Sequence, residues 1–585
     1  MENAEIARVL KRFADLLEIK GGNQFRVRAY RDAARTVNTF PRPMDAALEE
    51  GEDLTELQGI GEDMQEHIRD ITQTGTMPQY EELAAEMPES LIEIMNLEGM
   101  GPKRTAQLWH ELDIRDLKEL QAAAEKGDVV ALDGFGEKTQ QGILEEIERY
   151  KGREQRTLLA EADQYVRSLT DYLQDASGLE RLEVAGSYRR RKETVGDIDI
   201  LAIASEEPQK IMTYFTEYGP VAEVIAAGET RGTVRLESGL DVDLRILEPK
   251  SFGAALLYFT GSKAHNIHLR KLAVDKDLRI SEYGIFAVDE EEEEGEDDPW
   301  AGEWLAGEKE EEIYDQIGLP WFPPELREDR GEIEEAQEGE LPELITQEDI
   351  RGDLQMHSTW SDGKSSLEDM LKGCRERGYE YFAITDHGPS LAMTQGLDAG
   401  KARDQWEEIN RLEEKYEGIR ILRGMEVDIL KDGTLDMDEE TLEKLDLVVA
   451  SIHSHLDLAP PDQTERILRA LEHPRVNILA HPTERKIQER SPMVFDMEAV
   501  LEAAAEHGVA VELNAQPNRL DLSDVQVRLA KEKGAVVVIN TDAHRVEELA
   551  YMRYGVDQAR RGWLEPGDVL NTLNAEKLLD WLERM

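Results

Sequence analysis

Three aspartates have the type and spacing needed to hold divalent cations. Asp197 and Asp199 flank the start of an apolar stretch, residues 198–203, whose composition is typical of a β-strand. Because residues two apart on a strand point to the same side, we expect both carboxylates on one face. Asp243 lies in a second such stretch, residues 240–245. Three carboxylates around two Mg²⁺ or Mn²⁺ ions are the arrangement for in-line phosphoryl transfer.

A Gly-Ser pair lies upstream of these aspartates, and Ser187 precedes Asp197 by ten residues. Gly186 and Ser187 can offer backbone and hydroxyl donors to phosphates, and Arg190 adds positive charge. An Asp-x-Asp motif alone is usually a solvated strand face. The Gly-Ser pair at this distance makes a nucleotidyltransferase palm the better interpretation.

A third motif, Tyr-Phe-Thr-Gly-Ser-Lys over residues 258–263, narrows the family. Together, the motifs of residues 1–325 resemble those of the family X DNA polymerases, the group that contains DNA polymerase beta. The resemblance implies that the three aspartates bind the catalytic metals and that Arg270 contacts the template strand. It also implies a nucleotide pocket formed by Gly186, Ser187, Arg190, Tyr258, Phe259, Gly261 and Asn266.

Three N-terminal segments share one pattern, an apolar residue between two glycines. The glycine pairs are Gly59 and Gly61, Gly99 and Gly101, and Gly134 and Gly136. Each precedes a helical stretch, a pattern typical of helix-hairpin-helix elements. The glycines permit positive φ and leave helix N-terminal amides free to face a phosphate. Such contacts position DNA without reading its sequence. A single copy could be a mere turn, but three copies predict that at least one contacts DNA; the third is the best candidate for packing alone.

The first hairpin lacks the amine that a 5′-deoxyribose phosphate lyase requires. The family resemblance places His67 at the position of the lysine nucleophile, and no lysine occurs between Lys20 and Lys103. The lyase reaction proceeds through a Schiff base, which imidazole cannot form. We therefore expect weak or absent lyase activity.

Seven apolar stretches in the C-terminal third end in side chains that bind metals. Helical segments such as 366–377 and 497–507 separate them, which predicts seven β-then-α units with a site at the strand C-termini. One histidine at a strand end would suggest a core residue, but seven such ends together indicate a metal cluster. The candidate ligands are Gln355, His357, Asp362, His387, Glu426, His453, His481, Asp542 and His544.

This set resembles the PHP (polymerase and histidinol phosphatase) domain, which implies a three-metal phosphoesterase site. The resemblance assigns one group to each ion: His357, Glu426 and Asp542; Glu426, His453 and His481; Asp362, His387 and His544. Up to three Mn²⁺, Zn²⁺ or iron ions suit these ligands, with a bridging hydroxide as nucleophile. Gln355 stands where many family members have the first His of a His-x-His pair, and its amide oxygen coordinates more weakly. His455 either supports a ligand or faces the substrate.

Acidity is the strongest feature of the composition. The 585 residues include 126 acidic and 68 basic side chains, a formal net charge of −58. Residues 289–349 hold 26 acids and three bases, so most of the charge lies elsewhere. A carboxylate-rich surface on which Arg outnumbers Lys is typical of halophilic archaea, where molar salt reduces the Debye length to about 3 Å. The alternative is a merely acidic mesophilic protein. Charge alone argues against a nucleic-acid partner, yet the basic clusters fall inside the motifs above.

Composition also limits class and location. Hydrophobic residues make up 40% of the chain, which excludes wholesale disorder. No apolar run is long enough to span a bilayer, and Met1–Leu17 is unlike a signal peptide. The single cysteine, Cys374, cannot form an intrachain disulfide, which favours a reducing cytoplasm. We expect a cytoplasmic monomer without membrane contact.

We therefore predict a multidomain chain that combines a helical N-terminal region, an α+β nucleotidyltransferase palm with thumb and fingers, and a (β/α)7 PHP barrel. The predicted boundaries are 1–85 and 86–152 for the hairpin regions, 153–325 for the polymerase, 326–348 for an acidic linker and 349–585 for the PHP domain. The partners implied are gapped or recessed DNA and dNTPs. The resemblance implies gap filling coupled to 3′–5′ exonuclease, 3′-phosphatase or abasic endonuclease chemistry. The alternatives are a non-catalytic PHP scaffold and a template-independent nucleotidyltransferase.

Overall fold

The computed structural model describes residues 3–39, 44–49, 53–57, 59–95, 97, 99–132, 134–153, 156–205, 207–288, 302–391 and 394–583. The chain divides into two units, Met1–Arg156 and Thr157–Met585. The acidic run 290–294 and its surroundings lie outside the described residues.

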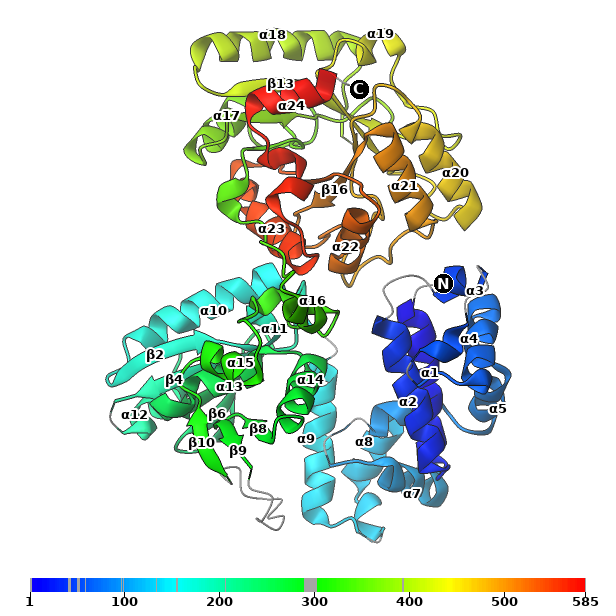
Figure 1. Ribbon diagram of the computed structural model, residues 1–585, viewed down its shortest axis with the longest axis vertical. Coiled ribbons are helices and arrows are strands. Elements are labelled where there is room, and N and C mark those ends of the chain that lie inside the picture. Colours follow the sequence, from blue (N-terminus) through cyan, green and yellow to red (C-terminus); the bar gives the residue numbers. More distant parts are fainter. Residues whose placement is uncertain are drawn as a thin grey trace. The chain divides into compact units, whose positions relative to one another are not determined.

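The first unit is helical, as the glycine-hairpin pattern predicts (Figure 1). Its first helices bury one apolar face, which includes Leu10, Phe13 and Val27. Three short helices precede the glycine turns and three longer ones follow them. The elements are α1 (Asn3–Ile19), α2 (Gln24–Thr39), α3 (Met44–Glu49), η1 (Leu54–Glu56), α4 (Glu62–Thr74), α5 (Pro78–Glu86), α6 (Leu91–Met95), α7 (Pro102–Leu112), α8 (Leu117–Lys126), η2 (Val129–Ala131) and α9 (Glu137–Arg153).

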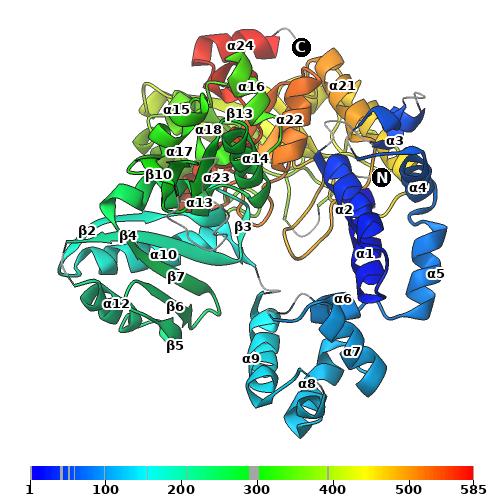
Figure 2. The same ribbon diagram turned by 60° about the horizontal axis from the view of Figure 1, so that its bottom comes forward.

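The second unit begins with a five-stranded sheet of order β2-β4-β7-β6-β5 (Figure 2). β4 and β7 are parallel, whereas the other neighbours are antiparallel. Even-numbered residues of β4 pack against α10 and α12, and odd-numbered Leu201 and Ile203 pack against α13. The period of two therefore decides which helix each β4 side chain faces. The elements are β2 (Leu179–Val184), β4 (Asp197–Ala204), β5 (Val221–Ala227), β6 (Arg231–Leu236), β7 (Asp241–Leu247), α10 (Leu159–Gln174), α12 (Pro208–Thr216) and α13 (Phe252–Thr260).

A small sheet and its helices follow the palm. The strand order is β10-β9-β8, and a separate apolar core includes Leu269, Ile285, Tyr314 and Phe322. The elements are α14 (Lys263–Val274), β8 (Leu278–Ser281), β9 (Gly284–Ala287), β10 (Glu303–Ala306) and α15 (Glu310–Ile317).

Residues 326–348, the expected acidic linker, connect two domains but are folded. α16 (Glu332–Glu338) lies in this segment, and its Ile333 belongs to the preceding core. Arg327 is fully buried, and Nη1 of its guanidinium lies 2.5 Å from Oε1 of Glu310. Glu328 of this segment lies 2.9 Å from Arg190 and 3.1 Å from Arg561, so its charge is neutralised by neighbouring cations, which the composition alone does not indicate.

The C-terminal domain is the predicted seven-stranded parallel barrel. Its strands follow sequence order from β11 to β17, and a bridge between Met356 and Ala543 joins the two outermost strands just beyond their ends. The interior is apolar, and α24 packs Leu578 and Leu582 against it. The strands are β11 (Gly352–Asp353), β12 (Tyr381–Ile384), β13 (Arg420–Asp428), β14 (Leu447–Ser451), β15 (Ile478–Leu479), β16 (Ala510–Asn514) and β17 (Val537–Asn540).

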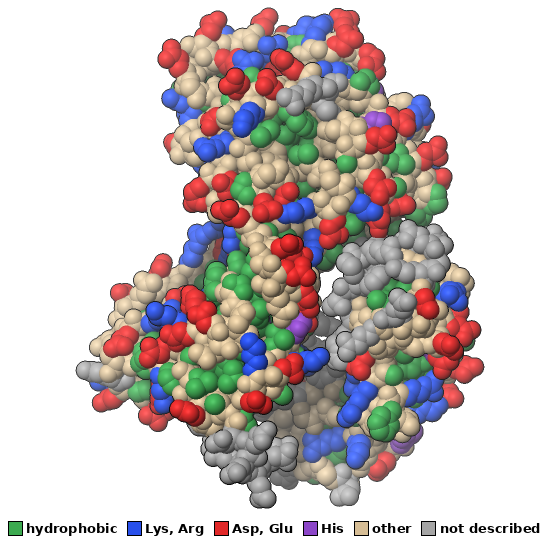
Figure 3. Space-filling model, viewed as in Figure 1, with side chains coloured by type: hydrophobic (Ala, Val, Ile, Leu, Met, Phe, Trp, Pro, Cys, Tyr) green, Lys and Arg blue, Asp and Glu red, His purple; other side chains and the backbone are tan. Residues whose placement is uncertain are grey.

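Helices surround these strands and bury apolar side chains against the outer face of the sheet. They are α17 (Leu367–Glu376), α18 (Ala399–Lys415), α20 (Pro460–Leu471), α21 (Met497–His507), α22 (Asp524–Glu532), α23 (Met552–Arg561) and α24 (Ala575–Glu583). On the face drawn in Figure 3, acidic side chains are spread widely rather than gathered in one place. Among the described residues, no helix is both long and apolar enough to cross a bilayer.

Candidate active sites

The sheet brings the three predicted aspartates together. Asp199 on β4 lies directly opposite Asp243 on β7 in the parallel register, and Asp197 precedes Asp199 by two residues. Loss of hydration, together with the neighbouring charges of Asp197 and Asp243, raises the pKa of Asp199 to about 7. Such mutual repulsion is what a divalent cation relieves, so this cluster fits a two-metal site.

Gly186 stands against this cluster at the start of α11 (Gly186–Arg189). Its φ is +68°, and a Cβ there would lie 2.6 Å from Oδ2 of Asp199. Only glycine combines that backbone conformation with so close an approach. The Gly-Ser pair therefore lies beside the carboxylates, as the sequence predicts.

The motif 258–270 spans the end of α13 and the first part of α14. Asn266 is buried, and its Nδ2 donates to the carbonyl of Tyr258 at 2.7 Å. Its Oδ1 has no hydrogen-bond partner, and a Cβ on Gly261 would come within 2.5 Å of it. The guanidinium of Arg270 lies 5.3 Å from the ring centroid of Tyr258. An unpaired buried acceptor such as Oδ1 of Asn266 suits a residue that contacts a ligand.

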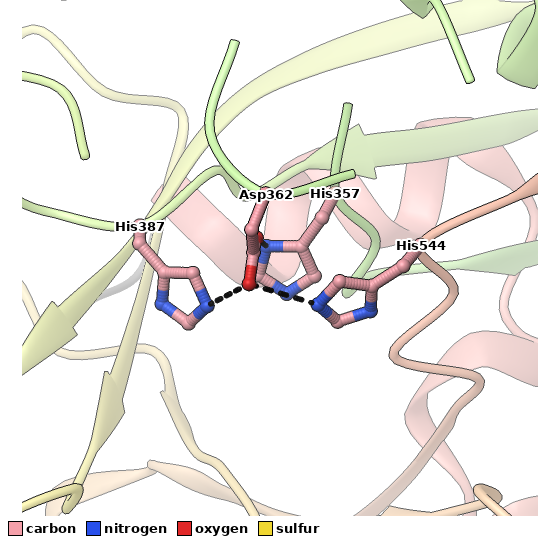
Figure 4. A group of neighbouring side chains, drawn as sticks. All are labelled: His357, Asp362, His387 and His544. Atoms are coloured by element: carbon pink, nitrogen blue, oxygen red, sulfur yellow. Dashed lines mark ion pairs between the residues drawn. The ribbon is translucent and has the colours of Figure 1, made fainter. Parts of the chain in front are cut away.

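The barrel gathers all nine candidate ligands of the C-terminal domain at or just beyond the C-terminal ends of its strands. Four groups have ligand atoms within 4.8 Å of one another: His357, Asp362, His387 and His544; His387, Glu426 and His453; His453, His481 and Glu484; His357, Glu426 and Asp542. In Figure 4, Asp362 lies between the rings of His387 and His544. Its Oδ2 is 3.7 Å from Nε2 of His387 and 3.4 Å from Nε2 of His544. Gln355 is fully buried two residues before His357.

Glu426 occupies the centre of the cluster. Its carboxylate oxygens lie 3.0 Å from Nε2 of His481, 3.2 Å from Nε2 of His357 and 3.4 Å from Nε2 of His453. Although burial raises the pKa of Glu426, the surrounding imidazoles lower it well below its usual value. Burial lowers the pKa of His387 to about 4, which keeps this ring a neutral ligand.

Orphaned buried atoms test whether this site fits metal ions. Both amide atoms of Gln355 and both ring nitrogens of His357 are buried without a well-formed hydrogen bond. Buried polar atoms normally find partners, so the amide oxygen of Gln355 and the ring nitrogens of His357 are suited to bind a cation, whereas the amide nitrogen of Gln355 is a donor and is not. The donors are imidazole and carboxylate, the set preferred by Mn²⁺, Zn²⁺ and iron.

Comparison with known proteins identifies the family. Residues 1–77 match a helix-hairpin-helix domain, 89–149 a SAM-like helix-hairpin-helix tandem, 255–328 a DNA polymerase beta thumb and 353–516 a PHP domain. DNA polymerase/3′-5′ exonuclease PolX of Bacillus subtilis (strain 168) is 38% identical over 586 residues, which cover 100% of both chains. The chain belongs to the PolX family of DNA polymerases.

Two shorter relatives match part of the chain. A probable phosphatase of Syntrophotalea carbinolica is 28% identical and covers 39% of this chain and 95% of its own length. A probable phosphatase of Edwardsiella ictaluri is 30% identical and covers 40% of this chain. These relatives give no support to a halophilic archaeal source, so the need for high salt stays a prediction.

Sequence reasoning missed two carboxylates that orient the ligands of this PolX-family chain. Asp428 Oδ1 lies 2.7 Å from Nδ1 of His453, and Glu484 contacts Nδ1 of His481. In both histidines the opposite nitrogen faces Glu426. A carboxylate on one ring nitrogen sets the tautomer and leaves the other free for metal. Only sequence spacing could have indicated these two carboxylates. Asp428 is two residues beyond Glu426 on one strand, and Glu484 is three residues beyond His481.

His455 lies apart from these groups. Its side chain is exposed and its φ is +55°, while His453 two residues earlier is half-buried in the cluster.

The helical unit places the hairpin glycines as expected. Gly59, Gly99 and Gly134 have φ between +77° and +83°, and Gly61 and Gly101 immediately precede α4 and α7. The helix N-terminal amides can thus face a phosphate. In the third hairpin, the carbonyl of Gly134 accepts a 3.5 Å bond from Arg104 of the second.

His67, which the family resemblance places at the position of the lyase nucleophile, is a packed residue. It is buried, and its Nδ1 lies 3.0 Å from the hydroxyl of Tyr30. Burial lowers its pKa. Its contacts are those of a neutral core histidine.

Proposed function

We propose that this chain is a template-directed DNA polymerase that fills gaps and hydrolyses 3′ ends in its PHP domain. The carrying observation is the full-length relationship to DNA polymerase/3′-5′ exonuclease PolX, combined with two separate clusters of metal-type ligands. The DNA is a gapped or recessed primer-template, and the nucleotides are dNTPs. A cytoplasmic monomer is part of the same proposal.

In the polymerase site, Asp197, Asp199 and Asp243 would hold Mg²⁺ or Mn²⁺, which activates the 3′ hydroxyl and stabilises triphosphate charge when bound. The chain's own contribution is to position the reactants. Gly186 lets the main chain approach the carboxylate of Asp199 closely, because a Cβ there would lie 2.6 Å from Oδ2. Tyr258 and Phe259 pack edge to face with centroids 5.1 Å apart, which gives the sugar a fixed wall.

In the PHP site, the nine candidate ligands would hold up to three Mn²⁺, Zn²⁺ or iron ions, which supply a hydroxide for attack on phosphorus when bound. Glu426 bridges neighbouring groups, while Asp428 and Glu484 keep two imidazoles oriented. The rings of His357 and His544 stack at 4.4 Å, which narrows their freedom to rotate. The proposal includes no lyase activity, because His67 cannot form a Schiff base.

One paired assay separates the two activities. Gapped and 3′-recessed DNA is incubated with Mn²⁺ at graded KCl, with wild type, Asp197→Ala/Asp199→Ala and His453→Ala. The double aspartate variant should lose extension and keep degradation, and His453→Ala should do the reverse. Matched controls are Asp241→Asn, on β7 but paired with Arg235 at 2.8 Å, and His473→Ala, which pairs with Glu439 at 3.1 Å.

A second candidate is a polymerase whose PHP domain is only a DNA-binding scaffold. Gln355 motivates it, because a buried amide is a weaker ligand than imidazole. In that case His453→Ala would leave any residual degradation unchanged. Extension that survives the double aspartate change would exclude the polymerase assignment.

A further inference from the structure

The nucleotide arm of the polymerase, residues 186–192, is packed against a helix of the PHP domain. α23 contributes Arg561, which is buried, and its Nη1 donates to the backbone carbonyl of Arg190 at 2.8 Å. The same nitrogen lies 3.1 Å from Oε1 of Glu328. Glu328 Oε1 in turn accepts from Nε of Arg190 at 2.9 Å. One PHP side chain thus holds the main chain of Arg190 directly and its side chain through a shared carboxylate.

A second ion pair secures the next residue of the arm. Arg191 Nη2 lies 2.7 Å from Asp557 of α23, while Arg191 Nη1 lies 3.3 Å from Asp163 of α10. The φ of Arg191 is +56°, a conformation that non-glycine residues rarely adopt. Tyr554 of α23 donates to Asp163 at 3.0 Å, so the helix binds both Arg191 and its partner. The strained turn after α11 is therefore held by contacts from both domains.

The arm also contacts the segment that contains the proposed nucleotide-pocket residues Tyr258 and Phe259. Arg190 Nη1 donates to the carbonyl of Thr260 at 2.7 Å, two residues beyond Tyr258. Burial would raise the pKa of Glu328, but Arg561 and Arg190 lower it to about 2, so this carboxylate stays ionised at any working pH. Buried charge pairs of this kind are screened by salt far less than exposed ones. They can hold a fixed geometry in a solvent that weakens surface pairs.

We propose that α23 of the PHP domain is a positioning element for the polymerase nucleotide site, with Arg561 and Asp557 as its positioning residues. This inference rests on the proposed polymerase function. The helix touches the arm and not the reacting atoms, so its role is to hold Arg190 and the Gly186–Arg189 turn where the triphosphate is to bind. The PHP domain then serves nucleotide addition independently of its own hydrolysis.

Steady-state gap filling at varied dNTP tests the idea with Asp557→Asn and Arg561→Lys. Asn keeps the shape of Asp557 without its charge, and Lys keeps the charge of Arg561 without its forked donors. We expect KM for dNTP to rise about five- to twentyfold, with kcat and DNA affinity changed less. The matched control is Arg560→Gln on the same helix, which breaks an ion pair to Glu325 at 2.7 Å that does not touch the arm.

Two further readouts separate positioning from general damage. The 3′–5′ degradation rate and the melting temperature report whether the PHP barrel remains intact in each variant. A fall in kcat, stability and degradation together, with KM unchanged, indicates a merely structural helix and overturns the proposal. KM within about twofold of wild type in both variants also overturns it. Failure of the proposed function is distinct, because wild-type protein would then extend no primer at all.

Discussion

Asp199 on β4 and Asp243 on β7 lie directly opposite each other in a parallel strand pair. Their carboxylates belong to residues 44 positions apart in the chain, and only the register of the sheet makes them neighbours. Burial and the like charges of Asp197 and Asp243 raise the pKa of Asp199, since each disfavours the ionised form. This relationship has a consequence for stability that can be measured without activity.

Asp199→Asn should stabilise the metal-free protein at neutral pH. Well below pH 3.8 the carboxyl is protonated in both states, and as pH rises the unfolded state ionises while the folded one resists up to its pKa of about 7. Wild type therefore loses stability across that window, by up to about 4 kcal/mol, and the Asn variant does not. Urea unfolding in EDTA at pH 4.5, 6 and 8 measures the difference. Asp241→Asn is the control, and a difference that does not vary with pH contradicts the prediction.

Asp428→Asn and Glu484→Gln should weaken metal binding in the barrel by about 10- to 100-fold, because each removes the carboxylate that orients a ligating imidazole. Mn²⁺ titration of exonuclease activity should show recovery at high Mn²⁺, whereas His453→Ala should not recover. Glu439→Gln, whose carboxylate meets only the peripheral His473 among the contacts above, serves as control. Unchanged Mn²⁺ dependence in both variants would mean that these carboxylates only fill space.

Gln355→His should raise exonuclease activity at limiting Mn²⁺ by several-fold, because imidazole is the stronger ligand at a fully buried position. Gln355→Leu, of similar volume, removes the donor and should lower activity and metal affinity. Metal content after dialysis provides a readout besides rate. Equal metal content in Gln, His and Leu forms would show that position 355 does not ligate.

The second hairpin should bind DNA more strongly than the first. Lys103 and Arg104 open α7, whereas Glu62 and Asp63 open α4, where they repel phosphate. Lys103→Glu should therefore weaken DNA binding, and Glu62→Lys should tighten it, with the salt slope changing by about one per charge. Fluorescence anisotropy at graded KCl measures both. If the two substitutions changed the DNA affinity by equal factors in their opposite directions, both hairpins would contact the DNA to the same extent, which contradicts the prediction.

Stability should rise with KCl into the molar range. A net charge of −58 repels itself in dilute buffer, and at 1 M salt the Debye length falls to about 3 Å. Thermal melts in KCl, compared with sucrose, distinguish charge screening from a general effect of excluded solutes. Full stability and activity in dilute buffer would favour the merely acidic alternative.

Much of the site follows from local pattern. Strand alternation places Asp197 and Asp199 on one face, and Gly186, eleven residues before Asp197, lies beside them. Likewise, apolar runs that end in His or Asp predict the barrel and the strand ends at which its ligands meet. These features depend on the period of a strand and on side-chain type, both of which can be read residue by residue.

Tertiary structure alone decided the rest. Glu484 approaches His481 through a turn with positive φ, and Arg561 reaches Arg190 across 371 positions of the chain. In the acidic segment 326–348, Ile333 joins the preceding apolar core and Glu328 pairs with Arg190 and Arg561. The physical reason is shared: these contacts depend on how separate cores and sheets pack together, and hydrophobic periodicity encodes which face is buried but not which distant partner covers it.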